Sequence, residues 1–488
     1  MPYIRRKYRN GSWPGVLGDV RFSTKYLFGV LKDDTLPVGT TSRSTIQYWT
    51  YRRHHPHHHF KRRPNMHHAN GIISLESESA SVYLTVKQSI LLSFNKMKSL
   101  VPSVPLLLWL SNLPSSLAYD NGLGRTPPMG WNSWNHFDCH IEEHLIRDTA
   151  QAMIDLGLKD VGYNYVNLDD CWQKSRNKTG YIVADATKFP SGIRALADHV
   201  HSLGLLFGLY SDAGIRTCQG RPGGLWHEQQ DAASYKEFDV DYLKYDNCFN
   251  LDLNVHKRYQ AMHDALNASG HALFFSMCEW GQEDPATWAM SVGNSWRTTG
   301  DINPTWKSIT NILDANDKWH SYAGPGGWND PDMLEVGNGD LTLAEQRSHF
   351  TLWALIKSPL LLGNDLQSVT DQTLEIITNT EIIALNQDPM GVQGYKRISL
   401  SGLEVWAGPL DQDNVALVLF NRADKPANIT AVWADIGIDF GSTVMHVRDL
   451  WKHEYMGVRV SNVTALVDSH DVVALRLSPA FVEPLKYR

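Results

Sequence analysis

The sequence has few cysteines, no long hydrophobic run and no overall excess of positive charge. Only 5 of its 488 residues are cysteine, too few for a fold built on a dense disulfide framework. The apolar stretch at Leu106–Leu110 is too short to cross a bilayer, so we expect no membrane span. The formal net charge is −7 at pH 7. A nucleic-acid partner requires a basic face, so we expect none.

Positive charge is concentrated in residues 1–96, which hold 15 Lys and Arg against 5 Asp and Glu. The tract YRRHHPHHHFKRRP at 51–64 is rich in histidine and has neither helical nor strand periodicity. A tail that binds metal or polyanions has this composition too, but a solvated, non-globular segment explains it more simply. We therefore assign residues 1–96 no function.

A secretory signal is predicted inside the chain, at residues 97–118. The segment MKSLVPSVPLLLWLSNLPSSLA has a basic start, an apolar centre and small residues before a cleavage point after Ala118. Because a signal peptide acts at an N-terminus, we expect translation to begin at Met97 and residues 1–96 to be an artefact of the gene model. The protein then enters the secretory pathway, with the cell exterior, the cell wall, or a vacuole or lysosome as its destination.

All the cysteines and four N-glycosylation sequons follow this segment, which agrees with secretion. Two disulfides and one free thiol suit an oxidising compartment. The cysteines are Cys139, Cys171, Cys218, Cys248 and Cys278, and the sequons begin at Asn177, Asn267, Asn428 and Asn462. We therefore predict a disulfide-bonded glycoprotein.

Short apolar runs alternate with amphipathic helical patterns from residue 119 to residue 391. The eight runs are PPMGWNSW, YNYVNLDDCW, LLFGLYSDAG, DYLKYDNC, ALFFSMCEW, NSWRTTGDI, YAGPGGWNDPDML and SPLLLGNDL. Strand and helix in repeated alternation predict an α/β fold, a parallel sheet closed into a (β/α)8 barrel. Active sites of such barrels lie at the carboxyl ends of the strands, which is where these runs place Asp, Glu, Asn and Trp.

Residues 392–488 show a different pattern, with an alternation of period two. The segments are GLEVWAGPL, NVALVLFNR, ANITAVWADIG, VMHVRDLW and HDVVALRLSP. This alternation predicts antiparallel strands, and we expect a C-terminal β-sandwich. We considered a carbohydrate-binding role for this domain and favour packing against the barrel as its task.

The segment YLKYDNC, residues 242–248, places a lysine two residues before an aspartate at the end of a predicted strand. Lys244 and Asp246 then project to the same face, where the ammonium favours the ionised carboxylate. An ionised and oriented carboxylate can act as a nucleophile. The heptad alone also fits an aspartate that only pairs with Lys244 or caps the next helix, and these alternatives stay open.

A second carboxylate follows in the segment SWRTTGDI. Arg297, Thr299 and Asp301 alternate on one face, and Asp301 ends a predicted strand two strands after that of Asp246. Two carboxylates across a barrel mouth can cleave a glycosidic bond, because one attacks the anomeric carbon while the other protonates the leaving oxygen. The pattern predicts a glycosidase.

Seven motifs resemble, in order and spacing, the barrel motifs of the α-galactosidases of glycoside hydrolase family 27: MGWNSW, NLDDCW, YSDAG, YLKYDNC, CEWG, WRTTGDI and AGPGGWNDPDML. The resemblance runs from about Asn121 to the C-terminus. It implies a retaining exo-glycosidase that removes terminal non-reducing α-D-galactosyl residues by double displacement. The substrates implied are small or polymeric α-galactosides, among them galacto-oligosaccharides, galactomannans and galactolipids.

The resemblance also implies roles for individual residues. Asp246 corresponds to the nucleophile and Asp301 to the general acid and base. The sugar ligands correspond to Trp131, which stacks on galactose, to Asp169 and Asp170, which bond the 4- and 6-hydroxyls, and to Tyr210, Cys218, Lys244, Trp280, Arg297, Asp332 and Met333. The implied disulfides join Cys139 to Cys171 and Cys218 to Cys248, and Cys278 is left as a free thiol that faces the pocket.

Galactose differs from glucose in its axial 4-hydroxyl, so a selective site needs charged acceptors aimed at that group. Asp169 and Asp170 supply two, whereas a helix cap would need only one. The segments NDPD and LDD lack the further His, Asp or Glu residues of a metal site, and hydrolysis by two carboxylates needs no ion. We therefore expect neither a metal nor a cofactor.

Three alternatives differ in substrate or in class. An α-N-acetylgalactosaminidase needs room at C2, which the bulky CEWG segment opposes. A β-L-arabinopyranosidase acts on a sugar without the hydroxymethyl group, and the pair Asp169 and Asp170 favours galactose instead. A non-catalytic sugar-binding barrel would require the loss of Asp246 or Asp301, and both are present.

Overall fold

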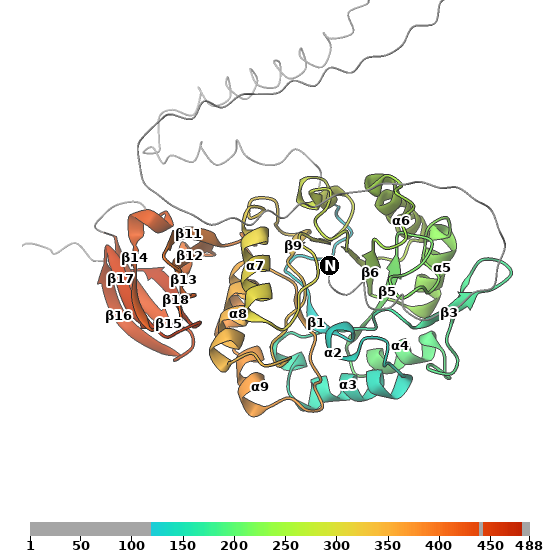
Figure 1. Ribbon diagram of the computed structural model, residues 1–488, viewed down its shortest axis with the longest axis horizontal. Helices are drawn as coiled ribbons and strands as arrows, with labels where there is room; N and C mark the ends of the chain where they lie inside the picture. The colour runs from blue at the N-terminus through green and yellow to red at the C-terminus, as the bar shows by residue number, and fades with distance from the viewer. Residues whose placement is uncertain (1–118, 439–442, 481–488) are drawn as a thin grey trace, which may run out of the picture. The chain divides into compact units, whose positions relative to one another are not determined.

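The computed structural model describes residues 119–438 and 443–480 (Figure 1). The predictions for residues 1–96 and for the signal at 97–118 concern segments outside the described residues. Within the described part of the chain, no helix has the length and apolarity needed to cross a membrane.

Eight parallel strands form one sheet, in the order β10, β1, β2, β5, β6, β7, β8, β9. Their bounds are β1 Met129–Asn132, β2 Tyr165–Asn167, β5 Leu206–Asp212, β6 Tyr242–Asp246, β7 Phe274–Met277, β8 Ser295–Arg297, β9 Trp328–Asp330 and β10 Leu360–Leu362. Leu334, in the segment after β9, forms a parallel bridge to Leu362 of β10, so this segment links the two edges of the sheet. Each predicted run contains one of these strands, and the predicted barrel is confirmed.

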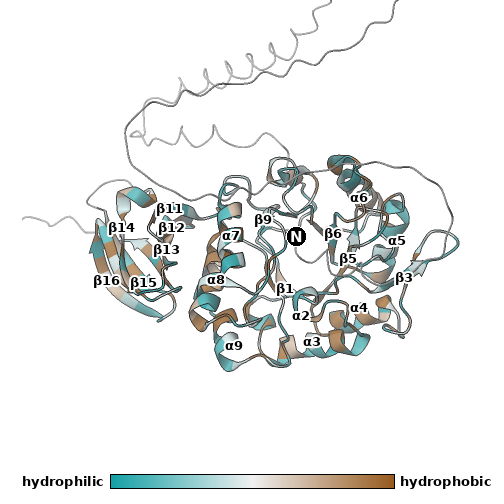
Figure 2. Cartoon of the chain, in the orientation of Figure 1, coloured by the Kyte–Doolittle hydropathy of each residue, from teal (hydrophilic) through white to brown (hydrophobic). Residues whose placement is uncertain are grey.

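Helices surround this sheet (Figure 1). They are α2 Trp134–Phe137, α3 Glu143–Asp155, α4 Ile193–Ser202, α5 Glu228–Phe238, α6 Val255–Ser269, α7 Trp306–Asp317, α8 Leu343–Leu355, α9 Asp371–Ile377 and α10 Thr380–Asn386. In α4 the buried residues recur at helical spacing, at Ile193, Leu196, Ala197 and Val200. Figure 2 shows hydrophobic and hydrophilic residues mixed along α3 and α4, as expected for helices with one buried face. A short hairpin, β3 Gln173–Arg176 and β4 Ile182–Ala184, follows β2.

Strand β6 contributes both an aromatic ring and charged groups to the interior of the barrel. Tyr242, Lys244 and Asp246 alternate along β6, so their side chains share one face of the sheet. The Tyr242 ring stacks on Phe274 of β7, with ring centroids 5.0 Å apart. Lys244 and Asp246 follow toward the carboxyl end of the strand, so the packed core ends where the charged residues begin.

Antiparallel strands follow the barrel: β11 Tyr395–Leu400, β12 Leu403–Leu410, β13 Asn414–Asn421, β14 Ala427–Val432, β15 Val444–Asp449, β16 Glu454–Val460, β17 Asn462–Val467 and β18 Val472–Pro479. Six of them form a sheet in the order β11-β12-β13-β18-β15-β16, and β14 pairs with β17. Residues of both sheets, such as Leu417 and Ile429, share a buried core. The predicted sandwich is confirmed. The segments recognised in the sequence did not include β11, β16 or β17, whose residues are mostly exposed or half-buried.

The sandwich packs against the barrel through α8, which contacts β13 and β18. Arg347 of α8 forms an ion pair with Asp471 at 2.5 Å, next to the start of β18. Arg422, which follows β13, pairs with Asp314 of α7 at 2.8 Å. The expectation that this domain packs against the barrel is therefore confirmed.

Candidate active site

Asp246 ends β6 as a buried carboxylate that accepts three hydrogen bonds. Tyr210 of β5 donates its hydroxyl to Oδ2 at 2.8 Å, and the indole N–H of Trp280 donates to Oδ1 at 2.9 Å. The backbone N–H of Asn247 also donates to Oδ1, at 2.9 Å. These donors come from three different strand ends or the loops after them, so they fix the direction in which the carboxylate points.

Lys244 contacts a different carboxylate from the one that the sequence suggested. Its ammonium binds Asp169 Oδ2 at 2.8 Å, across the sheet from β6 to the loop after β2. Burial raises the pKa of Asp246 above its ordinary value, and the charge of Lys244 lowers it by less. The charge of Lys244 therefore favours the ionised form of Asp246, as expected, although burial outweighs it and the net pKa is raised. A cap is excluded, because α6 begins with Asn254 as its N-cap.

Asp169 and Asp170 lie side by side after β2, both buried. Asn132 of β1 donates to Asp169 Oδ2 at 2.9 Å, beside the bond from Lys244. Asp170 accepts the backbone N–H groups of Cys171 at 2.6 Å and Gln219 at 2.9 Å. Burial raises the pKa of Asp170 to about 6, although these bonds oppose the rise. Neither residue caps the next long helix, since Gly192 is the N-cap of α4.

Arg297 connects the ends of β8 and β9. Its guanidinium pairs with Asp332 Oδ2 at 2.8 Å and with Asp301 Oδ1 at 3.2 Å. Asp332 also accepts the backbone N–H of Ile302 at 2.9 Å, so both loops are tied to one carboxylate. The side chain of Asp301 is 78% exposed, whereas Arg297 and Asp332 are buried. Asp301 thus lies on the solvent side of this cluster, in an open depression beside α7.

A cavity inside the barrel collects residues from the strand ends. It is lined by Asn132, Tyr242, Lys244, Ser276, Cys278, Arg297, Asp330, Asp332, Met333 and Leu361. Four of these are predicted ligand residues: Lys244, Arg297, Asp332 and Met333. Trp131 lies outside this set: it is fully buried in β1, and its indole N–H donates to the carbonyl of Asn364 at 2.8 Å.

Both implied disulfides are formed. Cys139–Cys171 joins the loops after α2 and β2, and Cys218–Cys248 joins the loops after β5 and β6. The second disulfide lies beside the carboxylate of Asp246, with Cys218 Sγ 3.5 Å from Oδ2. Cys278 is a buried free thiol that lines the interior cavity, as expected.

Sequence reasoning missed Asp212, the last residue of β5. It is paired in register with Asp246 of β6 and is completely buried. Its carboxylate accepts the backbone N–H groups of Gly214 at 2.6 Å and Cys248 at 2.9 Å, which links the loops after the two strands. Burial raises the pKa of Asp212 well above its ordinary value. The motif YSDAG contains this residue, and its place at a strand end was the available signal.

In the described part of the chain, Asp212, Cys218 and Cys248 form one cluster whose potential metal-ligand atoms lie close together. The two sulfurs are joined in a disulfide and cannot act as thiolate ligands. The cluster is therefore not a metal site.

Comparison with known proteins agrees with this geometry. Residues 126–388 match the family model described as Alpha galactosidase A, and residues 401–477 match the Alpha galactosidase C-terminal beta sandwich domain. The alpha-galactosidase of Cyamopsis tetragonoloba is 57% identical over 362 residues, which span 74% of this chain and 88% of that protein.

Two solved structures share the fold. Alpha-galactosidase I from Mortierella vinacea has a TM-score of 0.72 and 40% identity, with 73% of this chain and 98% of that chain covered. The α-galactosidase from Saccharomyces cerevisiae with raffinose has a TM-score of 0.70 and 33% identity, with 74% and 99% covered. The barrel, the sandwich and the ordered motifs all correspond, and the chain belongs to the α-galactosidase (melibiase) family, glycoside hydrolase family 27.

Proposed function

We propose that this member of the family is a retaining exo-glycosidase that removes terminal α-D-galactosyl residues, with Asp246 as nucleophile and Asp301 as general acid and base. The observation that carries the proposal is the set of donors on Asp246. Tyr210 of β5 and Trp280 after β7 donate to its two oxygens from either side of β6, so the carboxylate is buried and oriented, and the bond from Tyr210 opposes the rise in its pKa that burial causes. The charge of Asp301 acts on the same carboxyl, as expected for a cooperating pair.

In the first step, an oxygen of Asp246 attacks the anomeric carbon while the bond from that carbon to the leaving oxygen breaks. Asp301 gives its proton to the leaving oxygen. In the second step, Asp301 takes a proton from water, and the water oxygen displaces Asp246 from the same carbon. Two inversions retain the anomeric configuration.

The exposure of Asp301 suits a group that exchanges protons with water between the two steps. A substrate bound over the strand ends would shield this carboxyl from solvent, so its proton passes to the leaving oxygen and not to bulk water. Once Asp246 is esterified, its negative charge is gone and Asp301 can act as a base.

We propose that Asp169 and Asp170 recognise the 4- and 6-hydroxyls of galactose. Asp169 is charge-paired with Lys244, and both carboxylates are aligned by neighbouring donors, so they can be rigid acceptors for the sugar. Trp131 would supply the apolar face for stacking, and Tyr210, Cys218, Lys244, Trp280, Arg297, Asp332 and Met333 the remaining ring contacts. The yeast relative solved with raffinose supports a galacto-oligosaccharide as one substrate.

We also propose that the protein works in the secretory pathway or outside the cell, after removal of the signal at residues 97–118. The two disulfides support this, because such bonds persist in oxidising compartments. The sequon asparagines Asn177, Asn267, Asn428 and Asn462 are all exposed, so each is accessible to glycosylation. The proposed domains are the barrel at 119–391 and the sandwich at 392–488.

The test is turnover of p-nitrophenyl glycosides of α-D-galactose, α-N-acetylgalactosamine and β-L-arabinopyranose by the purified chain. We expect the galactoside to have a kcat/KM at least tenfold above the other two, with Asp246→Asn as the inactive control. Preference for another sugar would replace the substrate proposed here. Binding of galactose without any turnover would make the chain a sugar-binding barrel.

A further inference from the structure

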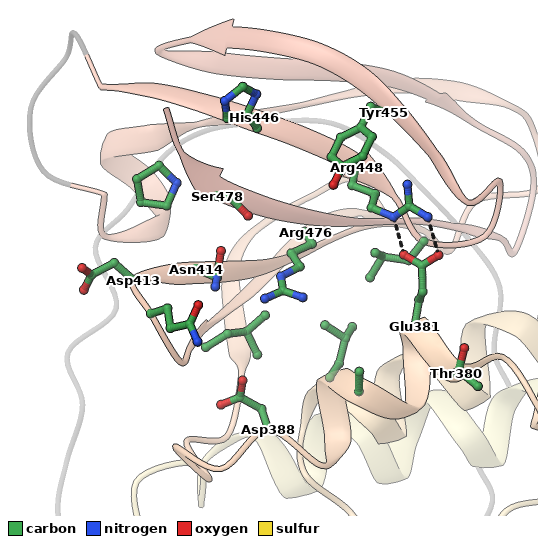
Figure 3. A pocket seen from close by; sticks show the side chains of 16 residues that line it. Thr380, Glu381, Asp388, Asp413, Asn414, His446, Arg448, Tyr455, Arg476 and Ser478 are labelled. Atoms are coloured by element: carbon green, nitrogen blue, oxygen red, sulfur yellow. Dashed lines mark hydrogen bonds and ion pairs between the residues drawn. The ribbon is translucent and has the colours of Figure 1, made fainter. Parts of the chain in front are cut away.

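A second cavity, of about 810 Å³, lies between α10 and the C-terminal sheet (Figure 3). Its walls come from α10, the hairpin between β12 and β13, and strands β15 and β18. None of the residues assigned above to catalysis or to galactose lines it. The volume falls within the range of about 300–1,000 Å³ that is typical of small-molecule sites.

Two arginines on neighbouring strands face this cavity, and only one of them is neutralised. Arg448 of β15 and Arg476 of β18 are paired in register. Arg448 binds both carboxylate oxygens of Glu381 on α10, at 2.6 and 2.7 Å. The side chain of Arg476 forms no hydrogen bond or ion pair with the other described residues and points into the cavity (Figure 3). Its five N–H donors are available to a ligand.

Acceptors lie on the other side of the cavity. Asp388, just after α10, is held by the backbone N–H groups of Met390 and Asp411, at 3.1 Å each. Asn414 donates its side-chain N–H to the backbone carbonyl of Asp411 at 2.6 Å, which orients the amide. The side-chain oxygen of Asn414 takes no part in this bond and can accept a hydrogen bond. Both side chains line the cavity and are anchored before a ligand arrives (Figure 3).

The balance of charge argues for a neutral ligand. The guanidinium groups of Arg448 and Arg476 are opposed by the carboxylates of Glu381, Asp388 and Asp413. Arg448 and Glu381 neutralise each other. An anion would therefore meet the carboxylates of Asp388 and Asp413, and a cation would meet the free guanidinium of Arg476. A ligand that carries many hydroxyls both donates and accepts, so it can use Arg476 and Asp388 at once.

An aromatic ring and aliphatic side chains complete the cavity. Tyr455 of β16 keeps 72% of its surface exposed at the rim, and the Arg448 guanidinium lies over its ring, 4.9 Å from the ring centroid. Leu385, Leu410 and Leu450 supply apolar surface within the cavity. Sugar rings have this dual character, because their C–H faces pack on apolar surfaces while their hydroxyls form hydrogen bonds.

We propose that this cavity is a second carbohydrate-binding site, in which Arg476, Asp388 and Asn414 bind hydroxyls of a neutral oligosaccharide and Tyr455 packs on one of its rings. The site is separate from the strand ends of the barrel and takes no part in bond cleavage. It gives the sandwich domain a binding role in addition to its packing against the barrel.

The test is isothermal titration calorimetry of the full chain with two neutral probes, β-1,4-mannotetraose and raffinose. The chain carries Asp246→Asn to prevent hydrolysis, and saturating galactose occupies the strand-end site. Mannotetraose has no α-galactosyl end. We expect saturable binding of at least one probe, and about a tenfold loss of affinity in Arg476→Ala and in Tyr455→Ala.

A matched control is Arg194→Ala. Arg194 is an exposed arginine of α4 that pairs with Asp198, and both residues are remote in sequence from those that line this cavity. It should bind the probes as the parent does, and thermal unfolding should show that all variants are folded. Absence of binding of both probes would overturn the proposal. The proposal would also be overturned if the affinities of Arg476→Ala and Tyr455→Ala for the probes stayed within twofold of the parent's affinity. Binding of sulfate, lost in Arg476→Ala, in place of the sugars would show an anion site instead.

Discussion

Tyr210 offers a direct way to alter the carboxylate of Asp246 without touching its charge. Its hydroxyl donates to Oδ2 at 2.8 Å within a buried setting, and Tyr210→Phe removes the donor while keeping the ring. A hydrogen bond to a charged acceptor contributes about 1.5–3 kcal/mol, and one pKa unit corresponds to about 1.4 kcal/mol. The pKa of Asp246 should therefore rise by about one to two units.

The sign follows from the forces on this carboxyl. Burial raises the pKa of Asp246, while Lys244 and the Tyr210 hydroxyl lower it. Loss of the hydroxyl destabilises the ionised form, so a larger fraction of the enzyme is protonated and inactive at low pH. The acidic limb of kcat/KM against pH should move to higher pH by about one to two units. The assay is hydrolysis of p-nitrophenyl α-galactoside across that range, with the limb read as a macroscopic property of Asp246 and the neighbouring carboxyls Asp212 and Asp301 that interact with it.

Tyr259→Phe is the matched control. Tyr259 is also buried and also donates to Asp246, but to the backbone carbonyl, at 3.2 Å. That carbonyl keeps a second bond, from the N–H of Ala213 at 2.9 Å. The acidic limb should therefore stay where it is in Tyr259→Phe. An unmoved limb in Tyr210→Phe, or an equal shift in both variants, would refute the reasoning.

Three further predictions concern the acid, a buried ion pair and a disulfide. Asp301→Asn should slow sugar leaving groups far more than p-nitrophenol, which departs without a proton, so equal slowing in steady-state assays would reject the acid role. Lys244→Met leaves Asp169 as an unpaired buried charge and should lower the free energy of unfolding by about 3–5 kcal/mol in urea titrations. A decrease of less than about 1 kcal/mol would contradict this prediction. Replacing Cys139 and Cys171 together by serine opens a loop with a sequence separation of 32 residues and should cost about 3–4 kcal/mol in the same assay, and an unchanged midpoint would argue against a stabilising disulfide.

The barrel could be predicted from the sequence because each strand has a local pattern, an apolar run followed by polar residues and then a helix. The alternation of Tyr242, Lys244 and Asp246 on one face of β6 is a local property of the same kind. The bond from Lys244 to Asp169 is not, because it joins residues 75 positions apart whose spacing is set by the closure of the sheet. The raised pKa of Asp246 was missed for a related reason: burial arises from tertiary packing, and a heptad does not reveal it.

Other parts of the structure have no local pattern at all. Asp212 acts through backbone N–H groups that two loops bring to it, and no side-chain motif marks such a partner. The cavity beside α10 is built from side chains between Thr380 and Pro479, each of which is ordinary in its own strand or helix. Such sites become visible only when the sheet and the helix are placed together.

The identity of the nucleophile is tested most directly by the product that Asp246→Gly forms with azide. Removing the carboxylate should nearly abolish turnover, yet it leaves Asp169 and Asp170 to bind galactose and opens space beside Tyr210 and Trp280. Azide that enters this space should attack the anomeric carbon of an activated α-galactoside and give the β-galactosyl azide, with inverted configuration. Rescue that gives only the α-azide, or turnover at the parental rate without azide, would contradict the role of Asp246.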